Sequence, residues 1–248
     1  MFASASEMKN GFGQYLKHVT DENGEVIITK NNIRVARLVP YVSDIEKYYT
    51  VKENALLYEY NKKTVSYEEF MDIYEKSDAR MEFINGEIFV LGSPNIFHQE
   101  ILGNLHVLFK EFFKGKKCRP YLAPFDCHFR KKNIKDPDVM QPDLIVLCDM
   151  ENNINEKGRY MGTPAFTLEI LSPSTRSIDM VYKLNTFMTS GVAEYWIVDI
   201  DNKWVTAYSF TDMKVAHMDI YKVGDTLHST EFHGFSVDIG NLFEEVRY

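Results

Sequence analysis

The chain has 248 residues, of which 45% are hydrophobic and 26% charged, and a formal net charge of -8. This length can bury a sizeable core, as one large domain or as two unequal ones. The acidic balance argues against a surface coated with basic side chains for unspecific nucleic-acid binding. A local DNA groove stays compatible with it, because net charge says little about how charge is distributed.

Three cysteines, Cys118, Cys127 and Cys148, form an odd set without C-x-x-C spacing. We therefore expect small buried thiols rather than a disulfide framework or a zinc site. The first residues lack the basic patch and apolar stretch of a signal peptide. No window approaches the about 18 consecutive apolar residues of a membrane-spanning helix. We expect no membrane segment and a cytoplasmic location.

Residues 1–45 are predicted to form a small unit of one helix and one hairpin. Ser4 and Ser6 are candidate N-caps, with Glu7 in the first turn. The helix has an apolar face at helical spacing, made of Phe12, Tyr15, Leu16 and Val19. Residues 21–24 should end it, and two strands, 26–29 and 35–39, should follow around an Asn31-Asn32 turn. So small a unit needs dimerisation or docking to be stable.

The segment from Ser6 to Asn10, with Phe12 and Leu16 and then the two strands, resembles the N-terminal half of Phd/YefM antitoxins. The resemblance implies a homodimeric β-sheet platform that binds operator DNA. The implied DNA contacts are Lys9, Asn10 and Arg37. The alternative is that these are solvated charges on a docking module. No toxin-binding tail is recognisable, so a toxin-like partner stays unidentified.

A connector, residues 46–63, is expected next, and its tyrosines favour packing against a neighbour over free coil. The larger domain, residues 64–248, should open with a helix capped by Ser66 and Glu69. The Asn85-Gly86 pair then predicts a hairpin with a type I′ turn. Glu82 lies in its first strand and shares a face with Ile84.

A helix over residues 97–114 is expected to carry His98 in its first turn. One or two strands between Arg119 and Arg130 should contain Asp126. The basic tip after them could touch phosphate, or its charges could simply be solvated; it consists of Arg130, Lys131 and Lys132.

Two acids accompany the apolar runs at the centre of the chain. Gln141-Pro142-Asp143 opens the run 144–147, and Glu169 lies inside the run 166–171. Short apolar runs with these boundaries predict buried strands. A buried carboxylate is costly unless it is paired, protonated or metal-bound. Two of them on neighbouring strands could hold a divalent cation.

A helix over residues 179–190 should follow, with Lys183 on it and Gly191 at its C-terminal cap. Residues 194–199 and 204–208 are predicted to be further strands, and the tail to alternate short strands with glycine turns. Helices between groups of strands indicate an α/β or α+β fold with a mixed sheet.

The larger domain resembles, over nearly its whole length, the Uma-two family of restriction-endonuclease-like proteins. The motifs that carry the resemblance are residues 82–87, Ser93-Pro94 with His98, residues 141–143, residues 169–175, Lys183 and residues 191–199. The family is placed in the PD-(D/E)xK nuclease superfamily, which implies a mixed central sheet flanked by helices. Pro142-Asp143 is then the PD element and Glu169 the second acid. The superfamily lysine would fall at Leu171; the family pattern offers Lys183 instead.

The resemblance implies a DNA endonuclease that uses Mg²⁺ or Mn²⁺. Asp143 and Glu169 would bind the metal, Glu82 would complete or orient its shell, and Lys183 would stabilise negative charge in the reaction. Other side chains would hold these groups in place without touching the metal; the candidates are His98, Asp126 and Gln141.

Two alternatives stay open at this point. Asp143 could cap a strand while Glu169 pairs with Lys183 or an arginine, with no metal bound. The chain could then be a non-catalytic DNA-binding regulator or antitoxin on a silent nuclease fold, because a fold does not guarantee its chemistry. The sequence does not indicate the target sequence, or whether the substrate is DNA or RNA, duplex or single strand.

Overall fold

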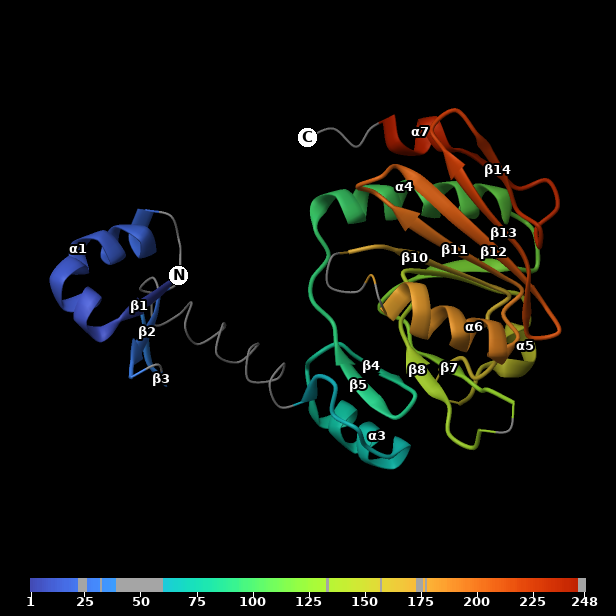
Figure 1. Cartoon of the computed structure of the whole chain (residues 1–248). Helices are drawn as coiled ribbons and strands as arrows, with labels where there is room; N and C mark the ends of the chain where they lie inside the picture. The colour runs from blue at the N-terminus through green and yellow to red at the C-terminus, as the bar shows by residue number, and fades with distance from the viewer. Residues whose placement is uncertain are drawn as a thin grey trace. The chain divides into compact units, whose positions relative to one another are not determined.

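A computed structural model describes residues 1–21, 26–31, 33–38, 60–132, 134–156, 158–172, 176 and 178–244. The chain divides into two compact units, Met1–Ala55 and Leu56–Tyr248 (Figure 1). The first helix ends at Asp21, within the predicted helix end at 21–24; residues 22–24 and most of the predicted connector, 46–63, lie outside the described residues.

The smaller unit contains the predicted helix and hairpin together with one strand that the sequence did not predict. Its elements are β1 (Phe2–Ser4), α1 (Ala5–Asp21), β2 (Val26–Lys30) and β3 (Ile33–Leu38). β1 pairs parallel to β2, and β3 pairs antiparallel to β2. Ser4 caps α1 as predicted, since its Oγ accepts from Glu7 N at 3.2 Å.

The predicted apolar face of α1 is only partly covered. Val19 is buried with Ala3, Met8 and Val26 in the core of the unit. Phe12 and Leu16, from the same predicted face, are 50% and 41% exposed. The described part of this unit therefore leaves apolar helix surface open.

The larger unit is built on a six-stranded mixed sheet with the order β13-β12-β11-β10-β9-β6. Only the β10–β11 pair is parallel among the described strands of this sheet; the other neighbours are antiparallel. The strands are β6 (Arg119–Leu122), β9 (Leu144–Leu147), β10 (Phe166–Ile170), β11 (Glu194–Asp199), β12 (Trp204–Thr211) and β13 (Lys214–Lys222).

Strand alternation sends side chains to two hydrophobic cores, one on each face of this sheet. Leu144 and Val146 pack on one face with α4 (Ile96–Phe112) and α7 (Ile239–Glu244). Ile145 and Leu147 pack on the other face with α6 (Leu184–Ser190). Figure 1 shows α4 and α7 on one side of the sheet and α6 on the other.

A four-stranded antiparallel sheet with the order β5-β4-β8-β7 adjoins the α6 side. Its strands are β4 (Met81–Ile84), β5 (Glu87–Val90), β7 (Cys127–Phe129) and β8 (Asp138–Met140), and α3 (Tyr67–Lys76) covers it. The predicted cap of α3 is confirmed, because Ser66 Oγ accepts from Glu69 N at 3.1 Å. The φ angles of 52° and 85° at Asn85 and Gly86 confirm the predicted turn.

The remaining elements are α5 (Met150–Asn153), the π-helix η1 (Ile178–Lys183) and a small hairpin of β14 (Thr226–His228) and β15 (Ser236–Asp238). The predicted helix over 179–190 is therefore two helices in series, with Lys183 at their junction. Its predicted cap at Gly191 is confirmed by a φ of 90°. The mixed-sheet α+β class is confirmed.

The prediction for the cysteines is wrong for two of the three. Cys118 and Cys148 form a disulfide, and only Cys127 is a buried thiol. The two partners adjoin Arg119 and Leu147, which face each other in the β6–β9 register. Within the described ranges, no helix is both long and apolar enough to cross a membrane.

Candidate active site

Glu169 reaches the interior of the larger unit because of its place in β10. Phe166, Leu168 and Ile170 point into the core beside α4. Thr167 and Glu169 therefore point to the opposite face, toward η1 and α6. Glu169 is only 4% exposed, so its carboxylate needs a partner in the protein.

Lys183 is that partner, and it binds more than one acid. Its Nζ lies 2.7 Å from Glu169 Oε1, 3.0 Å from Glu82 Oε1 and 3.4 Å from Asp179 Oδ1. All four side chains are buried. Asp179 and Lys183 are four residues apart on η1, whereas Glu82 comes from β4 in the other sheet. One ammonium thus joins both sheets and η1.

Glu82 has one oxygen fully engaged and one without a partner. Its Oε1 accepts from the backbone N–H of Gln141 at 2.9 Å as well as contacting Lys183. Its Oε2 is buried and has no hydrogen-bond partner among the described residues. A buried carboxylate oxygen without a partner costs stability, and this makes it available to a further donor or cation.

The charges in this cluster change the proton affinities of its members. Burial raises the pKa of Glu169 well above its ordinary value; Lys183 opposes this, and Asp179, Asp143 and Glu82 add to it. Burial alone would lower the pKa of Lys183, but Glu169, Glu82 and Asp179 together raise it well above its ordinary value. The lysine therefore stays an ammonium, and the surrounding acids compete for protons or for another cation.

Asp143 is tied to the same strand as Glu169. Its Oδ2 accepts from the backbone N–H of Ile170 at 2.8 Å and lies 3.1 Å from Nε2 of His98. His98 sits in the first turn of α4, as predicted, where Asn95 caps the helix. Nδ1 of His98 is buried without a hydrogen-bond partner in the described part of the chain. Asp143 therefore connects α4, through His98, to β10 at Ile170, the residue that follows Glu169.

Gln141 and Asp126 belong to a polar network behind Glu82. The amide Nε2 of Gln141 donates to Tyr74 Oη and to Asp126 Oδ1, both at 2.9 Å. Arg80 Nε donates to the other end of the same amide at 3.0 Å. The network fixes the Gln141 backbone that binds Glu82. Burial and the Asp126 carboxylate raise the pKa of Tyr74 to about 12, so its hydroxyl stays a donor.

The predicted basic tip is not one continuous set of exposed cations. Arg130 and Lys132 are exposed. Lys131 is buried, and its Nζ contacts Asp138 Oδ2 at 2.7 Å and Asn85 Oδ1 at 2.6 Å. Lys131 therefore forms a buried ion pair with Asp138. Its ammonium is not available for the predicted contact with DNA. The other predicted DNA contacts, Lys9, Asn10 and Arg37, are exposed on the smaller unit.

The oxygens of these acids have the chemistry that a divalent cation needs. The donors are the hard oxygens that Mg²⁺ and Mn²⁺ prefer, and Glu82 Oε2 is an orphaned buried acceptor. In the described ranges, however, no group of three or more His, Cys, Asp and Glu side chains is already arranged to hold a metal. Lys183 Nζ, 2.7 Å from Glu169, satisfies part of the need for positive charge. The chemistry fits a cation, although the ligands would have to adjust around it.

Asp179 is the member of the cluster that the sequence reasoning missed as a site residue. A signal was available in its spacing of four residues from Lys183, which puts the two side chains on one side of a helix. Three carboxyl groups, from Glu82, Glu169 and Asp179, thus act on a single lysine, and Asp143 adds to the effect on Glu169.

This chain is similar to several known proteins. The family model described as "Uma2: Putative restriction endonuclease" matches residues 67–240. An uncharacterised protein of Synechocystis sp., slr1290, is 26% identical over 115 residues, which are 46% of this chain and 57% of that relative. A solved structure from Anabaena variabilis, titled a "putative nuclease belonging to DUF820", has a TM-score of 0.56 at 20% identity. The match covers 70% of this chain and 97% of the Anabaena chain. At 20% sequence identity, this similarity shows a shared fold and nothing further.

Proposed function

Because the chain belongs to the Uma2 family, described as "Putative restriction endonuclease", we propose that its larger unit is a divalent-metal-dependent nuclease that hydrolyses phosphodiester bonds in DNA. One observation carries the proposal. Lys183 Nζ lies 2.7 Å from Glu169 and 3.0 Å from Glu82, so a lysine outside the usual superfamily position still meets the acids. The nuclease-like family and fold support the same reading.

Asp143 and Glu169 are the residues that would hold Mg²⁺ or Mn²⁺, with the unpartnered Oε2 of Glu82 as a further acceptor. When bound, such a cation supplies charge neutralisation at the phosphate and activation of a water. His98 and the Ile170 N–H hold Asp143 in place at 3.1 and 2.8 Å. These contacts orient the Asp143 carboxylate independently of a bound metal.

Lys183 would stabilise the negative charge that develops on the phosphate oxygens. Its raised pKa keeps the amine charged at neutral pH. Its contacts with Glu82 and Asp179 would keep the ammonium in place when a substrate or cation draws on Glu169. The lysine therefore acts as a fixed positive charge and not as a base.

For the smaller unit, we propose a homodimeric, antitoxin-like DNA-binding module with residues 1–45, joined by a connector, 46–63, to a nuclease domain, 64–248. Lys9, Asn10 and Arg37 would contact DNA there, and Arg130 and Lys132 would do so on the larger unit. The half-exposed Phe12 and Leu16 support dimerisation, because they offer apolar surface for a second copy. A cytoplasmic location belongs to the same proposal.

A second candidate is a DNA-binding regulator or antitoxin whose nuclease fold is silent. The observation that favours it is the lysine itself, which already binds three acids, without a ready-made metal site in the described residues. A cluster stabilised in this way could serve folding alone.

The two candidates differ in a cleavage assay on supercoiled plasmid and labelled oligonucleotides, run with Mg²⁺, Mn²⁺ or EDTA. We compare the wild type with Glu169→Gln and Lys183→Met, and with Asp201→Asn and Lys214→Met as matched exposed controls. The nuclease proposal predicts metal-dependent cleavage that both cluster variants lose and both controls keep. DNA binding without cleavage in any of the proteins would favour the regulator.

A further inference from the structure

Three consecutive apolar side chains lie exposed directly beside the acid–lysine cluster. Met180, Val181 and Tyr182 are 42%, 62% and 40% exposed. The residues on either side of them, Asp179 and Lys183, are the buried members of the cluster on η1. We call these three residues the η1 platform. One turn of helix thus points charge inward and apolar surface outward.

Contacts across the fold also place the platform beside the cluster. The ring of Tyr182 lies 5.9 Å from the ring of Phe89, at an interplanar angle of 55°. Phe89 on β5 faces Glu82 on β4 in the hairpin register. Tyr182 therefore packs against the hairpin that carries Glu82, while its neighbour Lys183 binds Glu82. The platform therefore lies at the surface beside the buried cluster.

The exposed apolar side chains of the η1 platform indicate that it binds something. Exposing apolar side chains to water is unfavourable. Contiguous exposed apolar side chains therefore mark interaction sites more often than isolated exposed side chains do. π-helical turns also occur frequently at functional sites. Here the π-helix η1 carries the three exposed apolar side chains, and it also supplies Asp179 and Lys183 to the cluster.

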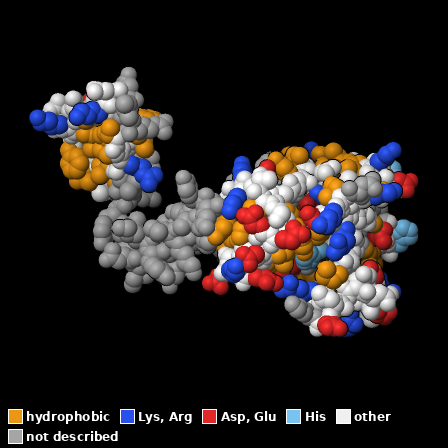
Figure 2. All heavy atoms as spheres, turned by 90° about the horizontal axis from the view of Figure 1, so that it is seen from below, with side chains coloured by type: hydrophobic (Ala, Val, Ile, Leu, Met, Phe, Trp, Pro, Cys, Tyr) orange, Lys and Arg blue, Asp and Glu red, His pale blue; other side chains and the backbone are white. Residues whose placement is uncertain are grey.

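A DNA strand bound at the acid–lysine cluster would also meet the platform. Asp179 and Lys183, on either side of the platform, belong to that cluster, so a base next to the bound phosphate would lie over the platform. On the face of the larger unit seen in Figure 2, basic and acidic side chains are interspersed with hydrophobic ones rather than gathered into a basic strip. Nucleobases can be held by another means, since every base has a π-face that stacks on aromatic and apolar side chains.

We propose that the η1 platform binds an unpaired base of a DNA strand, so that the preferred substrate is single-stranded or locally unpaired DNA. This inference rests on the proposed nuclease function and names its substrate class. Stacked bases of an intact duplex cannot reach such a platform without unstacking, which costs a few kcal/mol per step. Tyr182 stacks on the base, and Val181 and Met180 flank it.

The test is fluorescence anisotropy with a labelled single-stranded oligonucleotide and the matching duplex, in Ca²⁺ so that binding is read without relying on cleavage. We expect the wild type to prefer the single strand. Tyr182→Ala should weaken single-strand binding by roughly 5- to 150-fold, which corresponds to about 1–3 kcal/mol for one stacked base. Tyr182→Trp should retain it, and duplex binding should change by less than about twofold.

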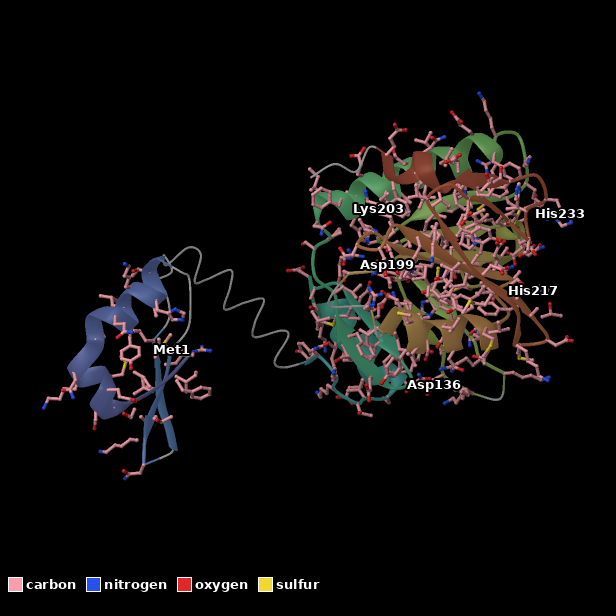
Figure 3. All side chains as sticks on the ribbon, turned by 45° about the horizontal axis from the view of Figure 1, so that its top comes forward. Met1, Asp136, Asp199, Lys203, His217 and His233 are labelled. Carbon is pink, nitrogen blue, oxygen red and sulfur yellow. A yellow bond between two sulfur atoms is a disulfide. The ribbon has the colours of Figure 1, made fainter. Side chains whose placement is uncertain are left out.

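Ile220→Ser is the matched control for loss of an exposed apolar side chain. Ile220 is 48% exposed and lies on the edge strand β13, three strands from β10. His217 on the same strand lies at the margin of the unit (Figure 3). This control should bind as the wild type does. Thermal melting of every variant checks that a loss of binding is not a loss of folding.

The inference is overturned if the wild type binds both DNAs equally or not at all, or if Tyr182→Ala binds as the wild type does. Binding unchanged by Tyr182→Ala, together with a platform-dependent change in oligomeric state, would assign the platform to a protein partner instead. The nuclease proposal fails separately. Selective binding of the single strand without metal-dependent cleavage would support the η1 platform as a base-binding site and refute the nuclease proposal. Metal-dependent cleavage that Tyr182→Ala leaves unchanged would support the nuclease proposal and refute the base-binding site.

Discussion

Replacing Lys183 by Met is the perturbation whose consequence the structure defines most sharply. The substitution keeps the apolar stem and removes the ammonium that contacts Glu169, Glu82 and Asp179 at 2.7, 3.0 and 3.4 Å. The acids would then be buried without a counter-charge. Breaking a buried ion pair by removing one partner costs about 3–5 kcal/mol, so we expect the free energy of unfolding to fall by about that amount.

The pH dependence of this loss has a definite sign. Without the ammonium, the folded-state pKa of Glu169, already well above its ordinary value of 4.5, rises further. An acid with a raised folded-state pKa stabilises the protein below its unfolded pKa and loses this contribution as pH rises through the folded pKa. Lys183→Met should therefore be closer to wild-type stability at pH 5 than at pH 8.

The assay is urea unfolding of the wild type, Lys183→Met, Glu169→Gln and the double variant, with Lys214→Met as the exposed control. The double variant should lose less than the sum of the two single losses, with a coupling of at least about 1 kcal/mol. The control should change stability by less than about 0.5 kcal/mol. A Lys183→Met protein within about 1 kcal/mol of the wild type, without coupling to Glu169, would refute the reasoning.

Three further outcomes follow from other contacts. Asp179→Asn should slow metal-dependent cleavage roughly 10- to 100-fold, through misplacement of Lys183, while Mn²⁺ affinity stays within about twofold; cleavage and titration calorimetry measure the two. Glu194→Gln should lower the free energy of unfolding by about 1.5–3 kcal/mol in a urea titration. The reason is that Glu194 accepts from Trp196 Nε1 at 2.7 Å, Ser229 Oγ at 2.6 Å and Glu231 N at 3.0 Å. Burial lowers the pKa of His128 below 6.5, so stability should fall as pH drops through about 6.5, and His128→Gln should remove that slope in melts between pH 7 and 5.

Local sequence signals predicted those parts of the fold that depend on a few neighbouring residues. Asn85-Gly86 fixed the hairpin because the turn requires two positive φ angles, which these residues tolerate. Ser66 and Glu69 located the start of α3 in the same local way. The apolar run 166–171 predicted that Glu169 lies in a buried strand, and β10 confirms this.

Features that depend on distant parts of the chain could not be read from the sequence. The Cys118–Cys148 disulfide requires knowing that β6 pairs with β9. Lys131 looked like a surface cation in a turn, but Asp138 on β8 holds it inside. The contact between Lys183 and Glu82 joins η1 to a strand much earlier in the chain, and β1 pairs with β2 across the whole of α1.

The most direct test of the central claim is Mn²⁺ binding by titration calorimetry at neutral pH. The claim is that Asp143 and Glu169 hold a divalent cation. We predict saturable binding by the wild type that Glu169→Gln and Asp143→Asn each weaken at least tenfold, about 1.4 kcal/mol, while Asp201→Asn binds as the wild type does. Binding that is equal in all four proteins, or absent from the wild type, would contradict the metal site and leave the cluster as an ion pair that stabilises the fold.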